Sequence, residues 1–104
     1  MQFTPDVEAI FEFTDSRREH LYEGYRPAHR ICEDYLTTGV HRYYNLKNST
    51  EQKLQGTITF ITPEAYPESL WIGKRIAMYE GSRIVGYATI TNIFNSILDR
   101  DSIK

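Results

Sequence analysis

Three histidines and one cysteine are the side chains of this sequence best able to bind a metal ion. The spacing of His20, His29 and His41 matches no common metal motif, and Cys32 adds only one sulfur ligand. We therefore expect no metal or other cofactor. The histidines are interpreted as solvated or as lying at the edge of the core.

Nucleophilic or acid–base catalysis would need side chains that converge. Cys32 needs an activating base, but His29 would face the opposite side of a strand, because side chains alternate with period two. The adjacent carboxylates Glu33 and Asp34 diverge for the same reason and suit a solvated edge. We expect an inert thiol and no catalytic residues, so the chain is not expected to be an enzyme.

A second candidate for chemistry is the segment Gly24-Tyr25-Arg26-Pro27. The guanidinium of Arg26 can clamp backbone carbonyls or a carboxylate such as Glu80. We favour this structural role over contact with a ligand.

Aromatic residues are abundant: eight Tyr, five Phe and one Trp. Such side chains suit strands, and any excess over the core can anchor a protein partner. Tyr66 and Trp71, in a loop bounded by prolines, are the best candidates for exposed anchors, and Tyr79 completes the set. A small core formed on the loop side is the alternative for Tyr66 and Trp71.

Alternation of apolar and polar residues predicts about six strands. Thr37-Thr38-Gly39 is expected to form a turn, and Gly81-Ser82 a tight hairpin. Gly86 suggests a bend, a bulge or a close approach of strands. Closure into a barrel would remove exposed strand edges. A sandwich of the same strands is the alternative that the pattern does not exclude. The predicted strands cover residues 7–13, 28–36, 40–46, 54–62, 76–79 and 84–94.

The 104 residues fit a single domain, with a core over about 3–94 and a polar tail over 95–104. The tail and the initial Met1 favour a complete small protein. A net charge of −2 gives no bulk signal for nucleic acid. No signal peptide or membrane-spanning run is visible, and the single cysteine fits a reducing compartment, so we expect a cytoplasmic protein.

Three segments together resemble the C-terminal β-barrel of elongation factor Tu. They are Gly24 to Pro27, the strand Thr-Ile-Thr-Phe-Ile-Thr-Pro at 57–63, and the hairpin Gly-Lys-Arg-Ile-Ala-Met-Tyr-Glu-Gly-Ser-Arg-Ile-Val-Gly at 73–86, which includes Gly73, Gly81 and Gly86. Their order and spacing agree over about 3–94. The resemblance implies an all-β, six-stranded antiparallel closed β-barrel. In the elongation factor this barrel contacts two other domains, the nucleotide exchange factor and the T-stem of tRNA.

The chain lacks the phosphate-binding loop of GTPases, and it departs from the family at the RNA-facing positions. Glu33 and Asp34 stand where the family is basic or hydroxylic, and two carboxylates would repel phosphates. The sequence therefore predicts a non-catalytic binding module for a protein partner, linked to translation or acting as a regulatory or immunity-type protein. The alternative is a tRNA-binding module that uses Arg17, Arg18, Arg26, Lys74 and Arg83. An enzyme with an unrecognised site ranks third.

Overall fold

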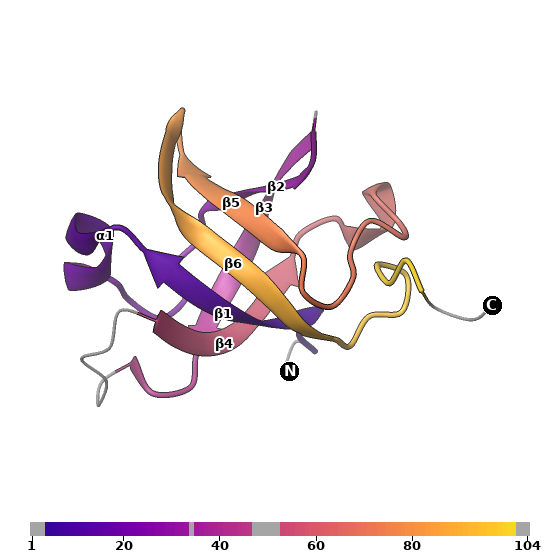
Figure 1. Cartoon of the computed structure of the whole chain (residues 1–104), viewed down its shortest axis with the longest axis horizontal. Helices are drawn as coiled ribbons and strands as arrows, with labels where there is room; N and C mark the ends of the chain where they lie inside the picture. Colours follow the sequence, from indigo (N-terminus) through magenta and orange to yellow (C-terminus); the bar gives the residue numbers. More distant parts are fainter. Residues whose placement is uncertain (1–3, 34, 47–52, 102–104) are drawn as a thin grey trace.

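The structure is a computed structural model that describes residues 4–33, 35–46 and 53–101. Strands dominate the described residues, and the helical segments α1 and η2 are short (Figure 1). The elements are β1 (Val7–Phe13), α1 (Asp15–Glu19), β2 (Ala28–Cys32), β3 (Tyr35–Tyr43), β4 (Lys53–Phe60), the 3-10 helix η2 (Pro63–Ala65), β5 (Arg75–Glu80) and β6 (Arg83–Ile93).

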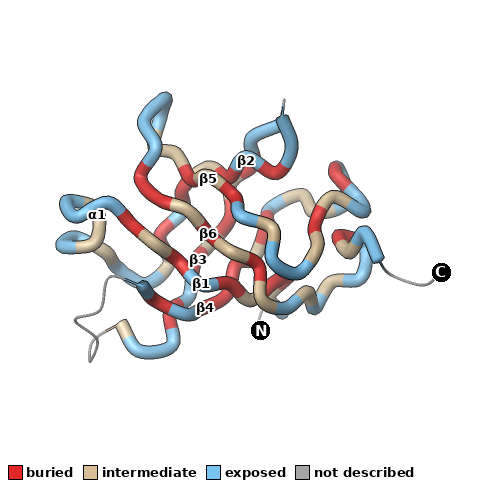
Figure 2. The backbone as a smooth tube through the Cα atoms, in the orientation of Figure 1, coloured by how far each residue is buried: buried red, intermediate tan, exposed pale blue. Residues whose placement is uncertain are grey.

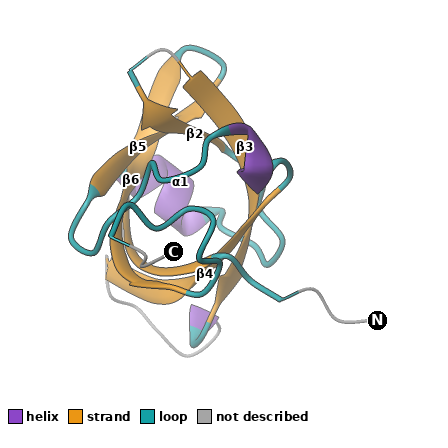
Figure 3. Ribbon diagram, turned by 90° about the vertical axis from the view of Figure 1, so that its right-hand side faces the viewer, coloured by secondary structure: helices purple, strands orange, loops and turns teal. Residues whose placement is uncertain are grey.

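The strands close into an antiparallel barrel in the order β1-β4-β3-β2-β5-β6 (Figure 3). This closed barrel confirms the predicted fold class and excludes the alternative of a two-sheet sandwich. Alternation explains why each strand turns one face inward. In β1, Val7, Ala9, Phe11 and Phe13 are buried, whereas Ile10 between them is exposed. Figure 2 shows the same change from buried to exposed along the other strands. The inward faces of the strands therefore line the hydrophobic core.

One predicted turn is wrong. Thr37, Thr38 and Gly39 lie inside β3, where Thr37 pairs with His29 and Gly39 pairs with Phe60. Threonine is β-branched and suits a strand. A Cβ on Gly39 would lie 2.6 Å from Ile58 Cγ2, so this glycine makes room for a neighbouring side chain. The chain reverses instead between β2 and β3, after Cys32.

The glycine motif positions are explained by backbone shape. Gly24, Gly73 and Gly81 have positive φ values, and Gly81 lies in the β5–β6 hairpin that the sequence predicted. Gly86 lies in β6, where a Cβ would lie 2.3 Å from the backbone oxygen of Glu12. A close strand approach is therefore observed at Gly86, and the register of β5 with β6 also shifts beside it, between the pairs Met78↔Gly86 and Tyr79↔Ile84.

Loops and the C-terminal segment cover one end of the barrel, opposite α1 (Figure 1). Tyr66, Leu70 and Leu98 from these segments join the buried core. The backbone N–H of Leu70 donates to the Leu98 carbonyl, and Asp6 accepts hydrogen bonds from Asn95 and from the Phe60 backbone. The segment expected to be a polar tail thus contributes Leu98 to the interior.

Candidate functional site

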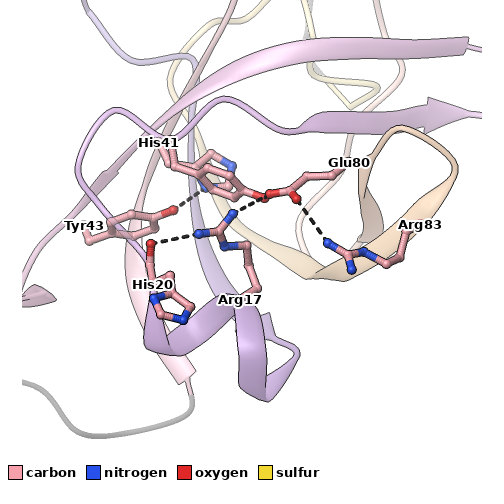
Figure 4. A network of polar contacts seen from close by, with 7 residues as sticks. Arg17, His20, His41, Tyr43, Glu80 and Arg83 are labelled. Carbon is pink, nitrogen blue, oxygen red and sulfur yellow. Dashed lines mark hydrogen bonds and ion pairs between the residues drawn. The ribbon is translucent and has the colours of Figure 1, made fainter.

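A polar cluster occupies the α1 end of the barrel, where α1 meets the β5–β6 hairpin (Figure 4). Arg17 Nη1 lies 2.6 Å from Glu80 Oε2, and its Nη2 donates to the His20 carbonyl at 2.8 Å. The hydroxyl of Tyr25 donates to the same Glu80 oxygen. Arg83 Nη2 lies 3.4 Å from Glu80 Oε1. One carboxylate thereby joins α1, the segment before β2, and the hairpin.

The electrostatics of the cluster follow from its hydrogen bonds. The Tyr25 hydroxyl, and then Arg17, stabilise the charged carboxylate and lower the pKa of Glu80. Burial and the bond to Glu80 raise the pKa of Tyr25. Arg17 binds Glu80 in the structure, whereas Arg26, for which the sequence suggested backbone carbonyls or a carboxylate such as Glu80 as partners, has an exposed side chain. The two arginines lie on either side of Tyr25 in the chain, and spacing alone does not decide between them.

Glu80→Gln should lower the free energy of unfolding by about 2 kcal/mol, because it leaves the part-buried Arg17 without its counter-charge. Urea unfolding at pH 7 measures the loss. Glu64→Gln, at an exposed carboxylate, is the matched control and should be neutral. Equal effects of the two changes would contradict a structural role for the cluster.

A second polar chain runs through the core. His29 and His41 are fully buried, and their Nε2 atoms lie 2.8 Å apart. His29 Nδ1 donates to the Thr37 carbonyl at 3.2 Å, since a carbonyl can only accept. In a neutral His29 the Nε2 atom must then accept from His41 Nε2. His41 Nδ1 in turn accepts from the Tyr43 hydroxyl at 2.7 Å.

Burial sets the charge state of this pair. Desolvation lowers the pKa of His29 to about 4 and lowers that of His41 well below its ordinary value. Both rings are therefore neutral at pH 7 and satisfy each other as donor and acceptor. The expectation of solvated or core-edge histidines is wrong for these two, whereas His20 is exposed.

The histidines and the cysteine that the sequence offered for metal binding or catalysis all lie among the described residues. No group of three or more metal-ligating side chains occurs among them. Cys32 is exposed while His29 is fully buried, which agrees with their predicted placement on opposite faces of the strand. No described helix has the length and apolar character needed to cross a membrane.

A cleft of about 870 Å³ opens beside the polar cluster. The segment after α1 forms one side, and the end of β3 with the residues after it forms the other. Tyr22 and Tyr44 are 54% and 52% exposed, so both rings present apolar area to solvent. The described lining is Arg18, Glu19, Leu21, Tyr22, Glu23, Tyr43, Tyr44, Asn45 and Leu46.

The cleft walls are tied to the barrel. The ring of Tyr22 packs edge-on against Tyr25 at 5.6 Å, and the hydroxyl of Tyr44 donates to Glu8 at 2.7 Å. Glu23 accepts from the backbone N–H of Tyr43 at 2.9 Å. An aromatic surface with such supports is preorganised for binding.

The predicted aromatic anchors have different surroundings. Tyr66 is only 5% exposed, contacts Phe60 and Tyr35, and has its pKa raised to about 12 by burial. It belongs to the loop-side core that was its alternative interpretation. Trp71 is half-buried, and the cations of Lys74 and Arg100 both lie over its ring. These two positions are therefore not the free aromatic pair that the sequence suggested.

Tyr79, the third predicted anchor, is half-buried on β5. The guanidinium of Arg30 lies over its ring at 5.2 Å, and Arg30 Nε donates to its hydroxyl at 3.3 Å. The Tyr79 side chain therefore contacts a cation of the same chain and is not a free aromatic anchor.

Among the predicted RNA-binding cations, Lys74 lies apart from the Glu80 cluster. Arg17 and Arg83 are both engaged by Glu80. Lys74 precedes β5, while Glu80 ends it, so the two positions are about 20 Å apart at ~3.3 Å per residue. Lys74 Nζ donates to the carbonyls of Ile31 and Ser69, and burial lowers its pKa. Arg18 lines the cleft and Arg26 is exposed.

Tyr22, Tyr44 and the His29–His41 pair are the residues that sequence reasoning did not select. The tyrosines were counted only as part of a general aromatic supply. Their convergence depends on the segment after α1 lying beside the end of β3, where the Gly24 N–H donates to the His41 carbonyl, and no local pattern encodes this contact. Alternation gave no signal for a buried His41, because the more apolar Val40 beside it lies on the other face of β3 and is only half-buried.

The chain matches no protein-family model.

Proposed function

We propose that this protein is a non-catalytic binding module for a protein partner, and that the partner docks in the cleft beside α1. The exposed rings of Tyr22 and Tyr44 in a supported cleft carry the proposal. Tyrosine is a favoured anchor at protein interfaces because it offers a large, stiff apolar area together with a polar tip. The mixed charges of Arg18, Glu19 and Glu23 around the cleft suit a polar rim.

The competing function is tRNA binding through the five predicted cations. Phosphate contacts need side chains with unengaged charge on a common face. Arg17 and Arg83 instead share one carboxylate, and Lys74 donates to two carbonyls near the other end of β5. These contacts favour the protein partner over RNA.

The resemblance to the elongation factor Tu barrel supplies the context of the proposal. We place the partner in the cytoplasmic translation apparatus or among factors that regulate it, including a protein that an immunity-type module would block. The six-stranded antiparallel barrel supports this resemblance at the level of architecture.

The test is affinity capture from nuclease-treated extract, followed by titration with the recovered protein. Replacing both Tyr22 and Tyr44 by Ser should weaken binding by at least about tenfold, since interface anchors contribute on the order of 2 kcal/mol each. Ile61→Ser, at a side chain that is 61% exposed beyond the other end of β4, is the matched control and should bind normally. Equal binding by the double variant and the wild type would reject the cleft as the docking site.

A further inference from the structure

The chain between β1 and β2 lies over the α1 end of the barrel and is not part of the sheet (Figures 1 and 3). The strand pairs of β1 end at Phe13, and those of β2 begin at Ala28. Thr14 and Gly24 each donate one backbone hydrogen bond to a barrel strand. We call residues 14–24 the α1 strap. Moving the strap away from the barrel would break no strand pair.

The α1 strap contributes little to the hydrophobic core. None of the residues of α1 is buried, and Leu21 after it is only partly buried against the core. Tyr22 is 54% exposed and contacts the ring of Tyr25 edge-on. Segments with few buried apolar contacts have low free energies of local opening. Apolar burial therefore holds the strap less firmly than it holds the strands.

A carboxylate at the end of β5 fastens the strap to the barrel (Figure 4). Arg17 Nη1 lies 2.6 Å from Glu80 Oε2, and its Nη2 donates to the His20 carbonyl, so one guanidinium joins Glu80 to the chain after α1. The same guanidinium lies over the Tyr25 ring at 4.8 Å. The side chains of Arg17 and Glu80 are 18% and 32% exposed. Water can therefore replace this ion pair when the strap moves away.

The closed position of the strap also carries a cost. Arg17 Nε is buried and has no hydrogen-bond partner among the described residues. Buried donors are normally paired, because an unpaired donor has lost its hydrogen bonds to water. Opening of the strap returns this donor to water and offsets part of the contacts that are lost. Gly24, where the strap rejoins the barrel, lacks the Cβ that restricts backbone rotation and can act as the hinge.

We propose that the α1 strap is a lid that opens as one unit at Gly24 while the barrel stays folded, and that the contacts of Glu80 keep the open form rare. Opening carries away Leu21, Tyr22 and Glu23, which line the cleft. A partner seated in the cleft binds only the closed form and therefore holds the strap closed. This regulation of docking rests on the proposed function, whereas the opening of the strap does not.

Hydrogen exchange of the free protein, followed residue by residue by NMR, tests the opening. The reporters are hydrogen-bonded amides that the closed strap protects: Arg18, His20, Gly24 and Tyr43. The amide of Tyr43 belongs to them because it donates to the Glu23 carboxylate. All four should show one common equilibrium constant for opening, at least about tenfold larger than that of the slowest amides of β1 and β4. Their exchange should also depend less on urea, because opening exposes less surface than unfolding.

Two substitutions separate local opening from unfolding of the barrel. Glu80→Gln removes the charge that holds Arg17 and should speed exchange of all four reporters by the same factor, at least about tenfold. Ile76→Val, at a buried side chain near the other end of β5, should speed the slowest strand amides about fivefold. It should leave the reporters unchanged, because Ile76 stays packed when the strap opens. Glu64→Gln, at an exposed carboxylate, is the control and should change neither set.

Three outcomes would overturn the proposal. Reporters that respond to Ile76→Val as strongly as the strand amides would show that strap and barrel unfold together. Unequal opening constants among the reporters would show that the strap frays residue by residue. Reporters unchanged by Glu80→Gln would show that the ion pair does not hold the strap, and Arg17→Gln replaces this variant if it does not fold. Because exchange is measured without a partner, its failure is distinguishable from a failure of docking in the cleft.

Discussion

Lowering the pH from 7 to 5 will weaken the folded barrel by at least about 2 kcal/mol through the buried pair His29 and His41. An unfolded histidine has a pKa of about 6.5 and takes up its proton across this range. In the folded chain, burial holds the pKa of His29 at about 4 and that of His41 also far below its ordinary value. The unfolded state therefore binds more protons, and stability falls as the pH drops below about 6.5.

The hydrogen-bond chain between the two rings explains why protonation of these histidines is unfavourable in the folded state. A proton added at His29 Nε2 would leave two donors facing each other at 2.8 Å, and one added at His41 Nδ1 would remove the acceptor of the Tyr43 hydroxyl. With its pKa near 4 in the folded chain, His29 alone contributes about 2 kcal/mol between these pH values, and the lowered pKa of His41 adds to the loss in the same direction. The pH range from 7 to 5 also distinguishes the effect of the histidines from that of Glu80. Because the pKa of Glu80 is lowered, its stabilising contribution is lost only at more acidic pH.

Urea unfolding at several pH values measures the effect. His20→Gln, at an exposed ring, should keep the pH slope, whereas replacing His29 and His41 together by Gln should remove it. If the double variant does not fold, nitrogen NMR of the wild-type rings gives the same answer, with His29 protonated at Nδ1 and His41 at Nε2. Rings that titrate near pH 6.5 in the folded protein, or a flat stability profile, would contradict the prediction.

Gly86→Ala will destabilise the barrel by at least about 3 kcal/mol, and it is expected to prevent folding at 37 °C. The new Cβ would lie 2.3 Å from the Glu12 oxygen and 2.9 Å from the Phe13 Cα. Both are backbone atoms of β1, so no side-chain rotation relieves the overlap. The β1–β6 ladder, which pairs Phe13 with Gly86, would have to separate there.

The matched control is Thr89→Ala, which places the same side chain at a half-buried position in the same strand. It should cost less than about 1 kcal/mol. Thermal unfolding followed by circular dichroism compares the two variants. A Gly86→Ala protein as stable as the Thr89→Ala protein would show that β1 and β6 do not approach this closely.

Local sequence patterns predicted those strands and turns that depend only on neighbouring residues. β1 was predicted over its observed range, and the β5–β6 hairpin was predicted at Gly81, because alternation and turn chemistry are properties of short segments. Thr37-Thr38-Gly39 misled because glycine after polar residues is typical of turns. Its actual role, leaving space for Ile58, depends on the partner strand.

The candidate site was harder to predict because it depends on contacts that are distant in sequence. Arg17 and Glu80 are separated by 63 residues, and the local motif pointed to Arg26 instead. His29 and His41 meet only through the register of β2 with β3. The cleft likewise brings the segment after α1 to the end of β3. Residue types were visible in the sequence, but their convergence was not.

Photo-crosslinking from the cleft tests the central claim most directly. A benzoylphenylalanine replacing Tyr22 should give one discrete adduct in native extract that survives nuclease and is destroyed by protease. The same group replacing Ile61, near the opposite end of the barrel, should not give that adduct. An adduct at position 22 that nuclease removes, or identical adducts from both positions, would contradict a cleft built to bind a protein.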